Sequence, residues 1–413
     1  MIRFIHAADL HLDSPFSGLK ELPKQLLAAI QQSTFQSLGR LVDAAIHNQV
    51  DFVLLSGDIY DLEDRSVKAQ VRFKREMERL QAVDIPVIMI HGNHDFIGNE
   101  TLHLSLPDNV RILGTSVETI RLTTKNSQAA AISGFSYGKR WVTDRMIADY
   151  PKRADQVDFH IGLLHGYQEG LNSEHAHYAP FTINELREKQ YDYWALGHIH
   201  TREKVAEFPL AYYPGNLQGR NKKETGEKGF LMVELEKQSG AQVAFIPSAP
   251  ILWERVVVDV LQTSTMDEYY RKIQEALPKK TSYNYLVSLE VLVSEEIEES
   301  LLRKISRPDF IEAHQQVNQD QFIWITDYTV TSSKNGDQKM DLSALFPEAW
   351  TMVLEDVTKE SVFSDITADF FEQSKYASLL KERTDFYREE LIKQALSELN
   401  MRPEIRGAEN SDH

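Results

Sequence analysis

Residues 87–95, VIMIHGNHD, place a short apolar run directly before a cluster of polar side chains. An apolar run of this length, followed by glycine, is typical of a buried strand. Gly92 lets the backbone turn sharply there and approach a ligand closely, because it carries no Cβ. Asn93 and His94 follow at once, with a carbonyl oxygen and an imidazole nitrogen that suit divalent metal ions. The stretch therefore predicts a strand that ends at a metal site.

Four further apolar runs end in the same way, at Asp9-Leu10-His11, Gly57-Asp58, His165-Gly166 and Gly197-His198-Ile199-His200. Sites of α/β proteins form just beyond the carboxyl ends of strands, so we expect these side chains to meet at one sheet edge. In the D-x-H and H-x-H steps the two side chains point to the same face of an extended segment. The chain has no cysteine, so a metal must rest on oxygen and imidazole donors.

The length of 413 residues exceeds what one hydrophobic core usually organises. Strand-like apolar runs alternate with amphipathic helical stretches through residues 1–249, which predicts an α/β domain. Residues 250–335 then repeat a strand, helix, strand, helix, strand pattern, which predicts a smaller α+β cap domain. A polar linker and apolar residues at helical spacing predict a C-terminal helical region over residues 336–413.

The formal net charge of -17 argues against coating nucleic acid or anionic membranes by bulk electrostatics. The sequence shows neither a signal-peptide pattern nor a run of roughly 20 apolar residues that could span a membrane. We therefore expect a cytoplasmic protein without membrane attachment. A nucleic-acid substrate would then need a partner or local positive charge, for which the candidates are Lys139, Arg140, Arg145, Lys152, Arg153, Arg220, Lys222 and Lys223.

The motifs D-x-H, G-D, G-N-H-D, H-G and G-H-x-H, in this order from Asp9 to His200, resemble those of the calcineurin-like metallophosphoesterase superfamily. The strings YDYWALGHIH at 191–200 and YYPGNLQGR at 212–220 are similar to SbcD-type DNA-repair exonucleases, and to their YhaO-like branch. The resemblance implies a sandwich of β-sheets flanked by helices. It also implies a metal-dependent DNA exonuclease or phosphodiesterase of repair or recombination, forming homodimers and working with an SbcC-like coiled-coil ATPase.

The resemblance further implies that two divalent ions, expected to be manganese, use a two-metal mechanism. One ion would be held by Asp9, His11, Asp58 and His200, and the second by Asp58, Asn93, His165 and His198. His94 would be the acid beside the scissile phosphate rather than a ligand. Asp95, the next residue, is expected to orient His94 or the backbone.

Several residues near these motifs allow more than one interpretation. Pro214-Gly215 fits a type II turn, and we expect Asn216, Gln218 and Arg220 beyond it to line a phosphate path. The histidines inside apolar runs, His6, His91 and His160, are expected in the core or behind the site. His175 and His177 repeat the H-x-H spacing in a polar loop, which predicts a surface or substrate-edge position.

One position departs from the resembling family. Some relatives carry a further histidine soon after the G-D motif, whereas GDIYDLED here places Tyr60, Asp61 and Glu63. A cleavage mode that relies on that histidine therefore loses its support.

Two other functions stay open on the sequence. The same metal centre could serve a phosphodiesterase or phosphatase for small esters, because a fold does not determine its substrate. A non-catalytic subunit that regulates an ATPase would be expected to have lost a ligand, yet every motif position is filled. The apolar stripe of the helical tail either packs on the cap domain or docks the ATPase partner.

Overall fold

The computed structural model describes residues 1–332 except 17–18, 20–21, 62–64, 99–103, 171–177, 238–239, 264, 280–282, 295 and 319–320, and in addition residues 359 and 362. The predicted helical tail, apart from those two positions, lies outside the described residues, as do His175 and His177. The chain forms two compact units, Met1–Asp259 with Ser264–Val291 and Glu298–Thr329, and Val260–Thr263 with Leu292–Ile297 and Val330–His413. The three predicted domain ranges stay predictions.

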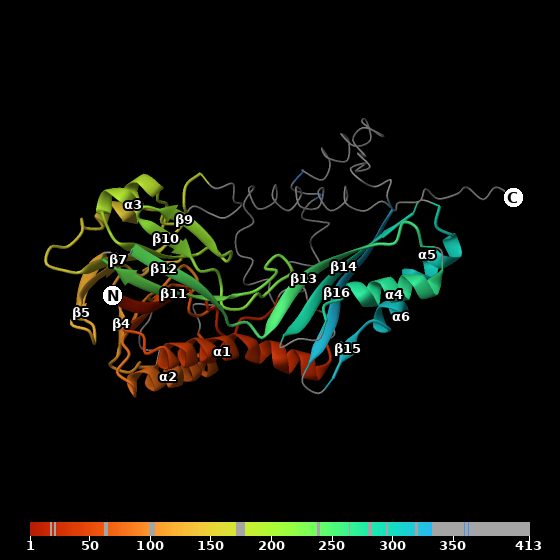
Figure 1. Cartoon of the computed structure of the whole chain (residues 1–413), viewed down its shortest axis with the longest axis horizontal. Coiled ribbons are helices and arrows are strands. Elements are labelled where there is room, and N and C mark those ends of the chain that lie inside the picture. The colour runs from red at the N-terminus through yellow and green to blue at the C-terminus, as the bar shows by residue number, and fades with distance from the viewer. Residues whose placement is uncertain are drawn as a thin grey trace. The chain divides into compact units, whose positions relative to one another are not determined.

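Two mixed six-stranded sheets lie in the first unit (Figure 1). The first has the order β12 (Gly240–Pro247), β11 (Gly229–Glu236), β1 (Ile2–Ala7), β2 (Phe52–Ser56), β3 (Val87–Ile90) and β4 (Val110–Ile112). The second has the order β5 (Glu118–Thr123), β6 (Ala129–Gly134), β7 (Phe159–His165), β8 (Tyr193–Gly197), β10 (Leu210–Tyr213) and β9 (Glu203–Glu207). In the first sheet β1, β2 and β3 are parallel, and in the second β6, β7 and β8 are parallel. The predicted α/β sandwich is confirmed.

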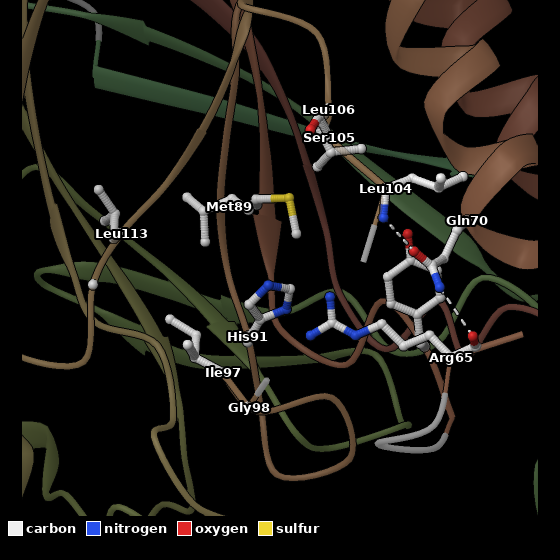
Figure 2. A pocket seen from close by; sticks show the side chains of 13 residues that line it. Arg65, Gln70, Met89, His91, Ile97, Gly98, Leu104, Ser105, Leu106 and Leu113 are labelled. Atoms are coloured by element: carbon white, nitrogen blue, oxygen red, sulfur yellow. Dashed lines mark hydrogen bonds between the residues drawn. The ribbon is translucent and has the colours of Figure 1, made fainter. Parts of the chain in front are cut away.

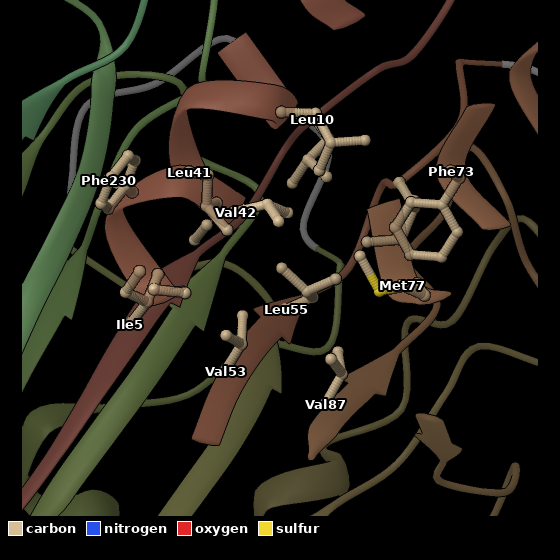
Figure 3. Close-up of a cluster of buried hydrophobic side chains, with 14 of the residues drawn as sticks. Ile5, Leu10, Leu41, Val42, Val53, Leu55, Phe73, Met77, Val87 and Phe230 are labelled. Atoms are coloured by element: carbon tan, nitrogen blue, oxygen red, sulfur yellow. The ribbon is translucent and has the colours of Figure 1, made fainter. Parts of the chain in front are cut away.

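Strand alternation explains how the first sheet is buried on both faces. Successive side chains point to opposite faces, so Phe52 and Leu54 pack against the second sheet while Val53 and Leu55 face the helices. The helices are α1 (Lys24–His47) and α2 (Val67–Gln81). Figure 3 shows this helix-covered cluster, to which Leu41, Val42, Phe73 and Met77 contribute. Burial on both faces is why these strands are apolar throughout.

The outer face of the second sheet is covered in part by the 3-10 helix η2 (Met146–Asp149) and by α3 (Ile183–Lys189). A capping box starts α3, because the Thr182 side chain accepts from the Glu185 backbone N–H and the Glu185 carboxylate accepts from Thr182 N–H. The cluster beneath these elements is rich in aromatic rings, including Tyr150 and Trp194.

A third, four-stranded sheet follows, in the order β13 (Ile251–Asp259), β14 (Asn284–Val293), β16 (Phe322–Ser332) and β15 (Gln316–Val317). Its helices are α4 (Met266–Ala276), α5 (Glu299–Ile305) and α6 (Pro308–Glu312). Trp253 of β13 packs with Phe16 and Ile30, which belong to the N-terminal part of the first unit. None of the helices that the structure describes is long and apolar enough to cross a membrane.

Candidate metal centre

The predicted ligand motifs converge because their strands run parallel within each sheet and the two sheets pack face to face. Three backbone hydrogen bonds tie the segments beyond the strands together: Asp9 N to Gly57 O at 3.1 Å, His11 N to Asp58 O at 3.0 Å, and Gly166 N to Gly197 O at 3.1 Å. Segments more than 100 residues apart in sequence thus meet, as when His165 Nδ1 lies 2.9 Å from Ser56 O.

Asp58 lies at the middle of the cluster and is 1% exposed. Its Oδ2 lies 3.3 Å from His165 Nε2 and 3.9 Å from His11 Nε2. Its Oδ1 accepts a hydrogen bond of 3.0 Å from the backbone N–H of His94. Asn93 directs its Oδ1 to within 3.1 Å of His165 Nε2. The Asp58 carboxylate therefore faces imidazoles delivered by both sheets.

Asp9 organises the H-x-H motif at the end of β8. Its two carboxylate oxygens accept from the backbone N–H of His198 at 3.2 and 3.1 Å. The Nε2 of His200 lies 3.8 Å from Asp9 Oδ1 and 3.1 Å from His11 Nε2. The rings of His198 and His165 lie edge to face, with centroids 5.3 Å apart.

The backbone at the site is strained at several of the predicted ligands, and hydrogen bonds around the site hold this conformation. Four of the predicted ligands have left-handed or otherwise positive φ values: Asp9 at 52°, His11 at 42°, Asp58 at 52° and His198 at 102°. Such conformations are uncommon for residues other than glycine and concentrate at functional sites.

Two glycines make room for the ligands. A Cβ on Gly92 would lie 2.7 Å from His165 Nε2 and would collide with the Asp58 carboxylate. A Cβ on Gly57, whose φ is 94°, would collide with the imidazole of His165. Both glycines are therefore required by the close approach of backbone to the cluster.

The electrostatics of the cluster suit a cation. Burial would lower the pKa of His165, but the Asp58 charge and hydrogen bond raise that pKa to about 9. Burial would raise the pKa of Asp58, yet the same partner holds it well below its usual range. Burial, followed by the Arg220 charge, lowers the pKa of His11 to about 3, so this ring is neutral. A neutral imidazole and buried carboxylates are the forms that bind metal, and a cation would replace the proton on His165.

Among the described residues, donor atoms lying within 4.8 Å of one another form three groups: Asp9, His11 and His200; Asp9, Asp58 and His165; and His11, Asp61 and His94. Together the first two groups contain five of the seven predicted ligands, and Asp9 belongs to both groups. Asn93 and His198 lie beside the second group through their contacts with His165. The donor set fits divalent cations, while the division into two ions bridged by Asp58 stays a prediction.

Asp61 joins the site although sequence analysis gave it no role. Its Oδ1 lies 3.1 Å from His11 Nδ1. The Arg220 guanidinium donates to this carboxylate and, at 3.0 Å, to Ser14 Oγ. Burial would raise the pKa of Asp61, but the hydrogen bond and charge of His11, with Arg220, hold it below its usual range. Its position three residues after Asp58 in GDIYDLED is the one signal that could have marked it.

Glu224 is the second residue that sequence analysis missed. Its Oε1 lies 2.8 Å from His200 Nδ1, and its Oε2 accepts from Asn216 Nδ2 at 2.8 Å. Burial would raise the pKa of Glu224, but the hydrogen bond and charge of His200 lower it to about 2. A carboxylate on Nδ1 turns Nε2 toward the metal site and orients the ring. We found no pattern in the sequence that would have indicated this contact.

Two of the three residues predicted to line a phosphate path have internal partners instead. Asn216 and Gln218 are 0% and 1% exposed. Gln218 Nε2 donates to Ile251 O at 2.7 Å, and Ile251 N donates back to Gln218 Oε1 at 3.3 Å. Their polar groups support the polypeptide around Glu224 and β13, so the geometry favours a positioning role over substrate contact for both. Arg220 alone of the three stands at the cluster.

His94 is half-buried at the cluster, with 33% of its side chain accessible, compared with 27% for His200. Its Nδ1 lies 2.9 Å from the backbone carbonyl of Asp61 and 4.0 Å from the Asp61 carboxylate. A carbonyl oxygen can only accept, so Nδ1 carries the hydrogen and Nε2 is the ring atom left for other partners.

Asp95 orients backbone, as predicted, and does not join the metal-binding groups among the described residues. Its carboxylate accepts from Gly92 N at 2.8 Å and from Ile59 N at 2.9 Å, and it contacts His91 Nδ1 at 3.0 Å. His91 therefore stands behind the site. His6 is buried in β1, where its ring contacts Leu196 O at 3.0 Å.

The basic residues expected to supply positive charge divide into paired and exposed groups. Arg145 pairs with Glu185 at 2.8 Å, Arg153 with Asp192 at 3.0 Å, and Lys222 with Asp327 at 2.8 Å. Lys139 and Arg140 are exposed, and neither forms an ion pair with a described residue.

A cavity of about 390 Å³ lies behind the His91–Asp95 pair. Figure 2 shows His91 and the guanidinium of Arg65 pointing into it beside Met89. Arg65 Nη2 donates to the backbone carbonyl of Asp95 at 2.6 Å. None of the predicted metal ligands lines this cavity, so it is separate from the candidate centre.

The fold and the ligand cluster define a metal-dependent phosphoesterase. Residues 2–202 match the calcineurin-like phosphoesterase family, and the chain belongs to that family. Over 329 residues, 78% of this chain and 80% of the relative, it is 39% identical to the uncharacterized metallophosphoesterase YhaO of Bacillus subtilis strain 168. The predicted family resemblance is confirmed.

Two more distant relatives carry nuclease or repair names. The DNA double-strand break repair protein Mre11 of Thermoplasma acidophilum is 24% identical over 306 residues, which cover 70% of this chain and 76% of the relative. The SbcD component of the nuclease SbcCD from Staphylococcus epidermidis is 24% identical over 312 residues, which cover 69% of this chain and 77% of the relative.

Proposed function

We propose that the chain is a metal-dependent DNA exonuclease that hydrolyses phosphodiester bonds in repair or recombination. The observation that carries the hydrolytic part is the placement of His94, a partly exposed imidazole beside the buried Asp58 cluster. The DNA part rests on the names of the Mre11 and SbcCD relatives, which align with about two thirds of this chain.

In this proposal one ion, with manganese as the expected metal, is held by Asp9, His11, Asp58 and His200, and a second by Asp58, Asn93, His165 and His198. When bound, two such ions lower the pKa of a water between them and offset the charge of the phosphate. The remaining steps fall to the side chains of this protein.

His94 is the proton donor to the departing sugar oxygen. Because Asp61 O occupies Nδ1, the proton leaves from Nε2, on the other side of the ring. The Asp61 carboxylate stabilises positive charge on the imidazole from 4.0 Å. The backbone N–H of His94 also donates to Asp58 Oδ1. The same residue therefore fixes the position of the acid relative to the ligand cluster.

Arg220 is the proposed contact to a phosphate oxygen. Its side chain is 13% exposed, and it already stands between Asp61 and Ser14. Its Nε is buried without a hydrogen-bond partner among the described residues, which leaves donor capacity on a planar guanidinium.

The test uses the purified full-length protein with manganese, magnesium or zinc on end-labelled single- and double-stranded DNA. We expect metal-dependent release of nucleotides that Asp58→Ala abolishes, because the cluster loses its central carboxylate. Asp108→Ala, at an exposed aspartate, is the matched control and should retain activity.

A chromogenic phosphodiester measured in parallel separates the two enzymatic interpretations. Faster turnover of the small ester than of any oligonucleotide would overturn the DNA assignment while keeping the phosphoesterase. Absence of metal-dependent hydrolysis of every ester would overturn catalysis and favour the regulatory subunit.

We also propose that an SbcC-like coiled-coil ATPase is the protein partner and that the chain forms a homodimer in the cytoplasm. The support for the ATPase partner is the SbcCD name of one relative, whereas the homodimer and the location are what the sequence resemblance and the sequence composition lead us to expect. Co-purification with the SbcC-type ATPase of the same genome, for the full chain and for a chain ending at Ser374, tests the partner. If the shortened chain stays folded and active and still binds the ATPase, the tail is not the docking element.

A further inference from the structure

An exposed tryptophan stands next to the candidate metal centre. Trp141 is 57% exposed, although large aromatic side chains are usually well covered. Its ring stacks on that of Tyr178, with centroids 5.4 Å apart and an interplanar angle of 16°. Tyr178 in turn lies edge to face against the ring of His198, with centroids 5.2 Å apart. Two ring contacts therefore connect the exposed tryptophan to a predicted ligand.

Backbone hydrogen bonds, the glycine of the H-G motif and a buried cluster hold the segments that carry these two rings. Ala179 N donates to Val142 O at 2.8 Å, which ties the Trp141 segment to the Tyr178 segment. Tyr167 N donates to Tyr178 O at 2.8 Å, next to Gly166. A Cβ on Gly166 would lie 2.5 Å from Ala179 O. The glycine of the H-G motif therefore leaves room for the segment that carries Tyr178. Val142 and Tyr178 are both buried in the same cluster.

Two exposed cations, Lys139 and Arg140, directly precede Trp141 in the sequence. The Arg140 guanidinium lies 5.6 Å from the centre of the Trp141 ring, and Lys139 precedes it as an exposed residue. Neither cation is engaged in an ion pair with a described residue. Trp141 keeps its 57% exposure with Arg140 in place, so part of the ring is open to a ligand.

We propose that Trp141, supported by Tyr178, is a stacking platform for a nucleobase of the substrate strand. Lys139 and Arg140 bind the phosphates on either side of that base. The inference rests on the proposed nuclease function and specifies its substrate as a single-stranded or unpaired segment, because a base inside a duplex offers no free face. Stacking on an aromatic side chain with nearby cations is how proteins bind such segments without sequence preference.

Binding to metal-free protein tests the platform independently of catalysis. The full chain is titrated with a single-stranded oligonucleotide at low salt while tryptophan emission is followed. We expect quenching in the wild type, because Trp141 is accessible to the base, whereas Trp194 and Trp253 are buried and Trp324 is half-buried. The fifth tryptophan, Trp350, lies outside the described residues, so Trp141→Phe identifies the part of the signal that comes from Trp141. Trp141→Phe should keep the affinity within a few-fold and lose most of the quenching. Trp141→Ala should weaken binding about tenfold or more.

Two controls make the result specific. Phe208→Ala removes an aromatic side chain that is 78% exposed in the turn between β9 and β10 and should leave binding unchanged. An oligonucleotide of abasic residues keeps every phosphate, and it should bind wild type and Trp141→Ala equally. Equal affinity of Trp141→Ala and wild type for the normal oligonucleotide, or equal affinity of wild type for normal and abasic strands, would overturn the platform.

The two proposals fail separately in these experiments. Base-dependent quenching without hydrolysis in any metal would support the platform and overturn the nuclease. Hydrolysis of DNA without base-dependent quenching would keep the nuclease and overturn the platform.

Discussion

The carboxylate of Asp61 lies 3.1 Å from Nδ1 of His11. Because an ionised carboxylate can only accept, this contact favours a hydrogen on Nδ1 of His11, the ring nitrogen nearest to it. The other nitrogen, Nε2, lies 3.9 Å from Asp58 Oδ2 and 3.1 Å from His200 Nε2. A carboxylate three residues after Asp58 thus lies in position to orient a predicted ligand.

Asp61→Asn should weaken metal binding about 10- to 100-fold, as expected for a group that orients a ligand. The amide can present its NH₂ group to His11, which favours the wrong tautomer, and it no longer offsets the charge of Arg220. Manganese titration by calorimetry measures the affinity. Asp108→Asn is the control, and an unchanged affinity in Asp61→Asn would show that His11 is oriented without it.

His94→Ala should lower turnover of DNA by about 10²- to 10⁴-fold and leave manganese affinity unchanged, because general acids contribute this much and His94 is not a proposed ligand. A substrate with an acidic leaving group, such as a nitrophenyl phosphodiester, needs less proton donation and should lose much less. An equal loss on both substrates would argue against proton transfer by His94.

Gly92→Ala should fold but bind metal weakly, because its Cβ would crowd His165 and the carboxylate of Asp58. Gly39→Ala is the matched control in α1, where a Cβ meets nothing within 4 Å. That control should be neutral or more stable by up to about 1 kcal/mol, since alanine favours helix. Thermal unfolding with and without manganese distinguishes the two: the metal-induced rise in Tm should disappear only in Gly92→Ala.

His160 should make stability depend on pH. Burial, followed by the charges of Arg153 and Arg121, lowers the pKa of His160 to about 4. The backbone N–H of Ala154 donates to its Nδ1 at 2.9 Å, so protonation would break that hydrogen bond. The unfolded chain takes up the proton near pH 6.5 and the folded chain near pH 4, so stability is full above pH 6.5 and falls between them.

The free energy of unfolding, measured by urea titration, should decrease by about 1 to 2 kcal/mol across this interval on account of His160, after allowing for screening by solvent. His160→Gln should be less stable at pH 7 and show a flatter dependence on pH. If the free energy of unfolding fell equally with pH in the variant and the wild type, groups other than His160 would cause the loss of stability at acidic pH.

Local sequence patterns are sufficient to predict the strand-end motifs and the kind of fold. Apolar runs that end at Asp58, Asn93 and His165 indicate strands buried on both faces, and such strands place their following residues at one edge. The kinds of donor atom at the site also follow from the sequence, because each side chain brings its own donor atoms wherever it lies in the fold. Family membership, too, was evident in the order of the motifs.

The residues that surround the ligands, and the directions in which they point, depend on contacts between segments far apart in the sequence. Asp61 and Glu224 orient His11 and His200 across long sequence separations, and no local pattern encodes a hydrogen bond of that kind. The sequence places Gln218 beside a turn and predicts that it lines a phosphate path, yet Gln218 is 1% exposed and donates to Ile251 of β13. Burial and partner choice depend on how the sheets and the third sheet pack together, which is a property of the whole chain.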